Sequence, residues 1–132
     1  MVVEDDETML ELIVYILESM GIGSISVAAD GVQAWRKFQD GEHFNLVICD
    51  WVMPGIGGLE VLKNIRAGSH AIPFILVTVC DSAEAIKEAT NSGVTAFISK
   101  PFKVEDIVSE VSRVLMDSAD SKDKSDSGVW EF

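Results

Sequence analysis

The sequence LVICDWVMPG, residues 46–55, joins a short hydrophobic run directly to an acid. Leu46 to Cys49 suit a strand that is buried on both faces, as in a parallel sheet covered by helices. Asp50 follows this run at once, and Pro54 and Gly55 then interrupt regular structure. The position of this acid needs an explanation, which the rest of the sequence supplies.

Composition limits the class of protein. The chain has 132 residues, of which 48% are hydrophobic, and this length fits one domain with a real core. The net charge of −12 would repel the phosphates of nucleic acids, so we expect no direct nucleic acid binding. Hydrophobic runs stay well short of the ~18 residues that span a membrane. We therefore expect a cytoplasmic protein without membrane association.

Strand-like and helix-like segments alternate along the chain. Short apolar runs predict strands at Val2–Val3, Ser24–Ala28, Leu46–Cys49, Phe74–Val79 and Ala96–Ser99. Apolar residues at intervals of three and four predict helices over Met9–Met20, Val32–Gln39, Leu59–Ala67, Ala83–Asn91 and Val104–Leu115. This β-α order predicts an α/β fold in which a doubly wound parallel sheet carries helices on both faces.

The pattern ends near residue 117. Residues 118–132 are rich in Ser, Asp and Lys, and this composition predicts a flexible acidic tail after one domain over residues 1–117. The aromatic residues Trp130 and Phe132 close the tail, and we predict no folded role for it. Cys49 and Cys80 lack the spacing of a metal or redox site, so we predict buried thiols without a disulfide.

Polar residues follow the predicted strands. In an open parallel sheet, functional groups gather at the carboxyl ends of the strands. Taken singly, each residue has an ordinary interpretation, such as a helix cap, a strand-forming threonine or a lysine facing solvent. Four strands that all end this way favour a shared functional site instead. The residues are Glu4, Asp5, Asp6, Asp50, Thr78 and Lys100.

Several carboxylates at one edge repel one another and need positive charge nearby. Lys100 supplies one charge, and a divalent cation would supply two. Oxygen ligands suit Mg²⁺, with Mn²⁺ as an alternative. An ionised Asp50 beside these cations could attack phosphorus and form an aspartyl phosphate. Lys100 would neutralise charge on the transferred group, and the Thr78 hydroxyl would hydrogen-bond to it.

These motifs resemble those of the response regulator receiver domain of two-component signalling, including the chemotaxis receivers. The resemblance covers about residues 1–117 and implies a flavodoxin-like fold with five helices and sheet order 2-1-3-4-5. It rests on VVEDDETM at 2–9, CDWVMPGIGG at 49–58, ILVTV at 75–79 and ISKPF at 98–102.

The resemblance implies a role for each residue at this edge. Asp50 would be the phosphorylation site. Asp5, Asp50 and the backbone carbonyl of Val52 would bind Mg²⁺, with Glu4 acting through a metal-bound water. Asp6 is left as a loop or cap residue, with an assisting role at the site as the alternative.

The resemblance also implies a switch. Thr78 would move toward the phosphoryl group and Phe97 into the space it leaves, with an ordinary packing role for Phe97 as the alternative. The bond between Lys100 and Pro101 is implied to be cis. The signalling surface would combine the fourth helix, the fifth strand and the fifth helix, and the thin apolar face of Ala83–Asn91 predicts weak attachment of the fourth helix.

The implied partners are a sensor histidine kinase or a histidine phosphotransferase, and a downstream protein target or output domain. The domain would catalyse its own phosphorylation and dephosphorylation without being a turnover enzyme. The alternative is a degenerate receiver that acts as an interaction module independent of phosphorylation. An FMN-binding protein is disfavoured because Glu4, Asp5 and Asp6 would repel its phosphate. A haloacid-dehalogenase-type phosphatase is disfavoured because Val52 stands where it needs a second Asp.

Overall fold

The computed structural model describes residues 1–68, 70–79 and 82–122. Its five strands form one parallel sheet in the order β2-β1-β3-β4-β5, which confirms the predicted flavodoxin-like topology. The strands are β1 Val2–Val3, β2 Val27–Ala28, β3 Val47–Asp50, β4 Phe74–Thr78 and β5 Ala96–Ser99.

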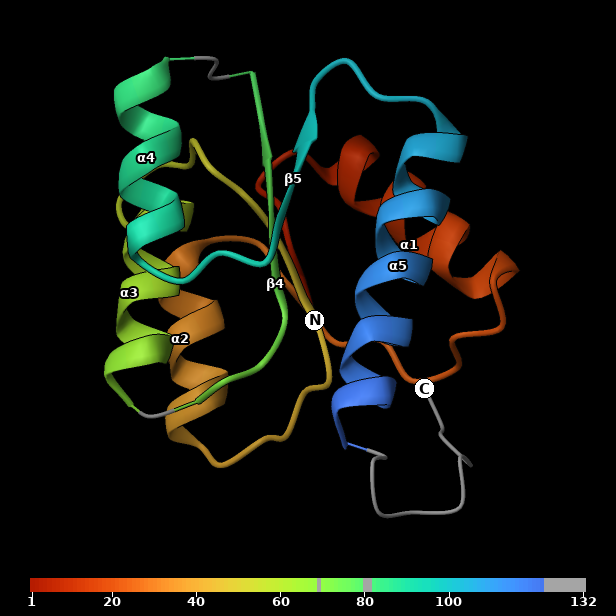
Figure 1. Cartoon of the computed structure of the whole chain (residues 1–132), viewed down its shortest axis with the longest axis horizontal. Coiled ribbons are helices and arrows are strands. Elements are labelled where there is room, and N and C mark those ends of the chain that lie inside the picture. The colour runs from red at the N-terminus through yellow and green to blue at the C-terminus, as the bar shows by residue number, and fades with distance from the viewer. Residues whose placement is uncertain (69, 80–81, 123–132) are drawn as a thin grey trace.

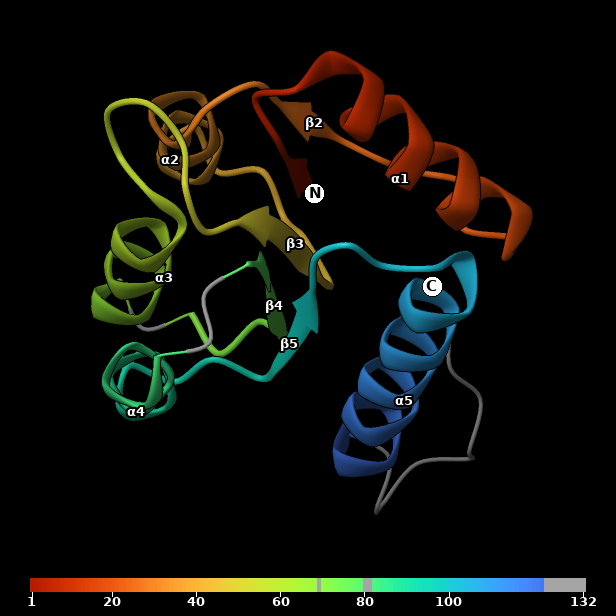
Figure 2. The same cartoon turned by 90° about the horizontal axis from the view of Figure 1, so that it is seen from above.

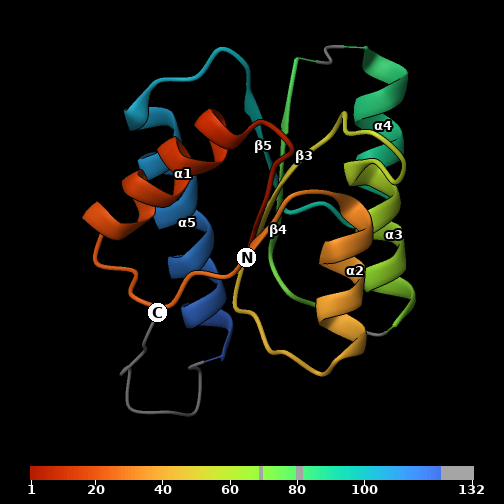
Figure 3. The same ribbon diagram turned by 180° about the vertical axis from the view of Figure 1, so that it is seen from behind.

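Helices cover both faces of the sheet, as predicted. They are α1 Glu7–Ser19, α2 Gly31–Gln39, α3 Gly58–Ala67, α4 Ala83–Asn91 and α5 Val104–Lys122. Figure 1 shows α1 and α5 on one side of the sheet and α2, α3 and α4 on the other. The views from above and from behind show the same three layers (Figures 2 and 3). The buried hydrophobic residues accordingly form two clusters, one on each face of the sheet.

The central strands are the best predicted elements. β1, β3 and β4 are buried along their whole length, which matches the continuous apolar runs in the sequence. β2 is the edge strand and covers only Val27–Ala28 of the predicted Ser24–Ala28. The carbonyl of Ser26 still accepts a hydrogen bond from the amide of Val2 at 2.9 Å, so the chain runs alongside β1 before the strand begins.

Several local predictions have clear outcomes. Asp6 is the N-cap of α1, because its Oδ1 accepts a hydrogen bond from the Met9 amide at 3.2 Å, and the helix therefore begins at Glu7. α5 continues to Lys122, beyond the domain boundary predicted at residue 117. The rest of the predicted tail, residues 123–132, lies outside the described residues. Cys49 is a buried free thiol, and Cys80 also lies outside the described residues.

None of the helices within the described residues is both long and apolar enough to cross a lipid bilayer.

A close backbone contact fixes the loop that follows β3. The amide of Gly58 donates a hydrogen bond to the Trp51 carbonyl at 2.8 Å, which closes the loop onto the start of α3. A Cβ atom at Gly58 would collide with the backbone carbonyl of Asp50 and would lie 2.9 Å from Leu76 Cδ2. Only glycine therefore lets α3 begin directly against the end of β3.

We expect Gly58→Ala to lower the free energy of unfolding by about 1–3 kcal/mol, because the added methyl group overpacks a buried contact. Gly23→Ala is the matched control, since a methyl group there would meet no other part of the protein within 4 Å and the substitution should be neutral or mildly stabilising. Urea unfolding of both variants checks this expectation. Equal stability of the two variants would contradict it.

Candidate functional site

Three acidic residues meet at the carboxyl edge of the sheet. Val3 pairs with Cys49, so the next residues, Glu4 and Asp50, lie side by side at the ends of β1 and β3. Glu4 is 2% exposed and Asp50 is 8% exposed, whereas Asp5 is exposed. One carboxylate oxygen from each of these three residues lies within 4.8 Å of the other two. The structure thus brings together the acids that the strand ends predicted.

Lys100 reaches this group from the end of β5, the edge strand that lies two places from β3. Its Nζ lies 3.0 Å from Oδ2 of Asp50 and 3.5 Å from Oε1 of Glu4. Its backbone amide donates a hydrogen bond to the Thr78 carbonyl at 2.8 Å, which fixes the residue just after β5. The Lys100–Pro101 peptide bond is cis, as the resemblance implied.

The surroundings of Glu4 disfavour the ionised form of its carboxyl group. Burial, together with the neighbouring carboxyl groups of Asp50 and Asp5, raises the pKa of Glu4 from its ordinary 4.5 to about 7. The hydrogen bond from the Asp6 amide to Glu4 Oε2, at 3.2 Å, acts in the opposite direction and is outweighed. Burial is thus the main reason that the ionised form of Glu4 is disfavoured, and the two neighbouring carboxyl groups add to its effect.

The pKa of Lys100 shifts in the complementary sense. Burial disfavours its ammonium form, but the hydrogen bond to Asp50 and the negative charges of Asp50 and Glu4 outweigh burial and raise the pKa. Lys100 is therefore firmly charged at neutral pH.

The remaining predicted site residues lie at the same edge. Thr78 ends β4 and is 3% exposed. Asp50 pairs with Val77, so Thr78 lies one position beyond the acid along the neighbouring strand. Val52 lies in the loop after β3, and its side chain is exposed to solvent. The strand register thus places Thr78 at this edge, and the loop after β3 places Val52 there.

One contact near the site has no sequence signal. Trp51, which follows Asp50, stacks on Phe97 of β5 with ring centroids 6.3 Å apart and an interplanar angle of 20°. Both rings are half-buried and pack against the core on the α2, α3 and α4 side. Phe97 therefore contacts the residue that follows Asp50. The hydrophobic patterns of β3 and β5 do not reveal this contact.

The carboxylate groups at this edge suit a divalent cation that prefers oxygen ligands. Glu4, Asp5 and Asp50 offer carboxylate oxygens at one place, and burial beside the other two carboxyl groups raises the pKa of Glu4. Mg²⁺ favours such ligands and keeps coordination positions for water and phosphate oxygens. Both Glu4 oxygens already have protein partners, which suits a contact through water better than direct coordination.

We expect Glu4→Gln to stabilise the metal-free protein increasingly as the pH rises from about 4.5 to about 7. In this window the unfolded state loses the Glu4 proton before the folded state does, so the native residue costs stability as the pH increases. Urea unfolding at several pH values in EDTA measures the difference between variant and native protein.

Glu60→Gln is the matched control, because Glu60 is an exposed acid on α3. A difference for Glu4→Gln that stays constant with pH, or equals that of Glu60→Gln, would contradict the assigned environment.

Comparisons with known proteins agree with this geometry. The profile of the response regulator receiver domain matches residues 1–112. The chain is 32% identical over 117 residues to the chemotaxis protein CheY-3 of Vibrio cholerae, covering 87% of this chain and 89% of that protein. It is also 32% identical over 117 residues to the chemotaxis protein CheY1 of Helicobacter pylori, covering 87% and 94% of the two chains.

Solved structures give the same result. The receiver domain of the Francisella response regulator 1452 superposes with a TM-score of 0.81 at 27% identity, covering 89% of this chain and 95% of that one. The chemotaxis response regulator CheY4 of Vibrio cholerae superposes with a TM-score of 0.79 at 30% identity, covering 86% and 95%. The chain belongs to the response regulator receiver domain family of two-component signalling.

Proposed function

We propose that this receiver domain accepts a phosphoryl group on Asp50 in a Mg²⁺-dependent reaction and thereby changes the surface formed by α4, β5 and α5. The observation that carries the proposal is the meeting of Glu4, Asp5 and Asp50 within 4.8 Å, with Lys100 Nζ 3.0 Å from Asp50 Oδ2. The phosphoryl donor is the phosphohistidine of a sensor histidine kinase or a histidine phosphotransferase.

In the proposed reaction, a carboxylate oxygen of Asp50 attacks phosphorus and forms a P–O bond. The P–N bond of the donor phosphohistidine breaks, and its electron pair returns to the imidazole nitrogen. Asp5, Asp50 and the Val52 carbonyl would hold Mg²⁺, with Glu4 behind a water molecule. The bound cation would neutralise negative charge on the phosphoryl oxygens.

The chain's own residues complete the site. Lys100 already lies against Asp50 and is charged, so its ammonium group is placed to stabilise the oxygens of the incoming group. The Thr78 hydroxyl donates a hydrogen bond to the attached phosphoryl group, and the displacement of Thr78 favours inward packing of Phe97. The product stays covalently attached until Asp50 is dephosphorylated, so the domain acts as a switch rather than as a turnover enzyme.

The proposed signal leaves through protein contacts in the cytoplasm. The downstream partner is a protein target or an output domain that recognises the α4, β5 and α5 surface. The net charge of −12 is unfavourable for nucleic acid, so we assign no nucleic acid contact to this chain.

We expect acetyl phosphate with Mg²⁺ to add one phosphoryl group to the protein, as measured by intact mass. EDTA should prevent the reaction, because the three acids then lack the cation that offsets their charge. Asp50→Asn should prevent it as well, because the amide is a far weaker nucleophile than the carboxylate.

Asp6→Asn is the matched control, because Asp6 caps α1 and asparagine caps a helix as well as aspartate does. This variant should still be phosphorylated. An unmodified native protein would point instead to an interaction module independent of phosphorylation, and modification of the Asp50→Asn variant would refute the assignment of the acceptor.

A further inference from the structure

α4 is held to the rest of the domain by little apolar packing. The structure describes all of its residues, and among them Ala89 alone is buried. The neighbouring helix α3, of nearly the same length, buries Gly58, Val61, Leu62 and Ile65. Few buried contacts make a segment easy to displace, so the polar contacts of α4 carry an unusual share of its attachment.

One end of α4 is firmly fixed by Arg66 of α3. Its Nε and Nη2 donate hydrogen bonds to the Gly93 carbonyl at 3.1 and 2.8 Å, and its Nη1 donates to the His70 carbonyl at 2.8 Å. Hydrogen bonds from a charged donor are stronger than neutral ones. This guanidinium group therefore ties the turn after α4 to α3.

The start of β5 adds a second constraint at the same end. The Thr95 amide donates to the Phe74 carbonyl at 2.8 Å, and Thr95 Oγ1 accepts from the Phe74 amide at 2.9 Å. The chain from Gly93 to Thr95 is thus joined to both α3 and β4. These contacts favour a movement of α4 in which this end stays in place and the helix rotates about it.

The other end of α4 follows Thr78 closely along the chain. Thr78 ends β4, and Ser82 is the N-cap of α4. A displacement of Thr78 would therefore act on the N-terminal end of α4, opposite the end that Arg66 holds. Glu88 lies within the moving part, and its Oε2 lies 3.1 Å from Nζ of Lys63 on α3.

We propose that the Lys63–Glu88 ion pair is a brake that opposes the rotation of α4 during phosphorylation, with Arg66 as its pivot. The inference rests on the proposed function. The pair joins the well-packed helix α3 to the lightly packed helix α4. Rotation of α4 would therefore move the Glu88 carboxylate away from the Lys63 ammonium group. A contact made only in the resting position shifts the equilibrium toward that position by its own free energy.

The expected effect is modest because both side chains are largely exposed, at 48% for Lys63 and 57% for Glu88. Removal of the brake should tighten the binding of beryllofluoride, a phosphoryl mimic, about two- to fivefold. The effect should shrink as salt rises from about 0.05 to about 1 M, because salt screens exposed charges.

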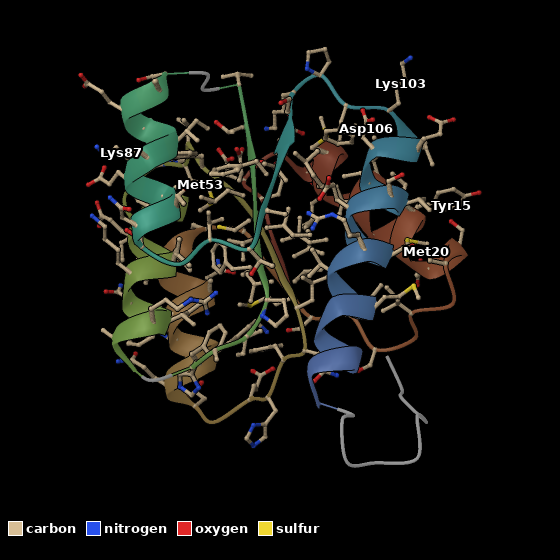
Figure 4. All side chains as sticks on the ribbon, viewed as in Figure 1. Tyr15, Met20, Met53, Lys87, Lys103 and Asp106 are labelled. Atoms are coloured by element: carbon tan, nitrogen blue, oxygen red, sulfur yellow. The ribbon has the colours of Figure 1, made fainter. Side chains whose placement is uncertain are left out.

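Isothermal titration with beryllofluoride and Mg²⁺ tests the proposal. Lys63→Glu places like charges opposite each other and should tighten binding, and adding Glu88→Lys should restore the native affinity by rebuilding the pair in reverse. Lys87→Glu is the matched control, since it makes the same charge change on α4 where the side chain points away from the molecule (Figure 4). The same affinity for Lys63→Glu and Lys87→Glu, or no restoration in the double variant, would overturn the brake.

Failure of the proposed function has a different signature. If native protein did not bind beryllofluoride, or if Asp50→Asn bound it equally well, the phosphoacceptor assignment would fail whatever the result at position 63. In that case, hydrogen exchange of the α4 amides in metal-free protein still tests whether the Lys63–Glu88 pair restrains α4. Lys63→Glu should speed this exchange and the double variant should reverse it, and unchanged exchange would overturn the inference.

Discussion

The crowding of Glu4, Asp5 and Asp50 beside the Lys100 ammonium group is the constraint on which the site depends. Parallel pairing of β1 with β3 forces two of these acids side by side, and Lys100 reaches both from the end of β5. Burial, and to a smaller extent the neighbouring acids, raise the pKa of Glu4. Three carboxylates arranged in this way suit a divalent cation, and in the proposed function this cation makes the site receptive to a phosphoryl group.

The packing around the site differs between the strands that carry the acids, which are rigid, and the helix α4, which is easily displaced. The acids stand on strands that are buried along their whole length, so the site itself is well fixed. α4 beside it is lightly packed and is attached largely by polar contacts with α3. The stacked rings of Trp51 and Phe97 join the loop after Asp50 to β5. Local chemistry at a rigid edge can thus bias an element whose position costs little to change.

Much of the fold was predictable because burial leaves a clear pattern in the sequence. β4 was predicted to within one residue from its continuous apolar run, and β3 was predicted except for its shift toward Asp50. β2 was predicted too long, because alternating residues at an edge do not show where strand pairing begins. α1 begins before its first apolar residue, since the Asp6 cap rather than the hydrophobic spacing sets its start.

The site was predictable as a set of residues but not as a geometry. Strand ends identified the acids, Thr78 and Lys100, because parallel strands bring their carboxyl ends to one edge. The two contacts of Lys100, the Trp51–Phe97 stack and the Lys63–Glu88 pair all depend on register and side-chain conformation across separate elements. Of the flexible tail predicted over residues 118–132, the part over residues 123–132 stays a prediction, whereas residues 118–122 continue α5.

Binding of Mn²⁺, followed by electron paramagnetic resonance at neutral pH, tests the proposed cation site most directly. We expect a single Mn²⁺ per chain that Mg²⁺ displaces. Asp5→Asn should bind the ion clearly more weakly, whereas Asn at the exposed Asp40, which ends α2, should leave binding unchanged. Absence of stoichiometric binding, or equal binding by the two variants, would contradict a cation site at this edge of the sheet.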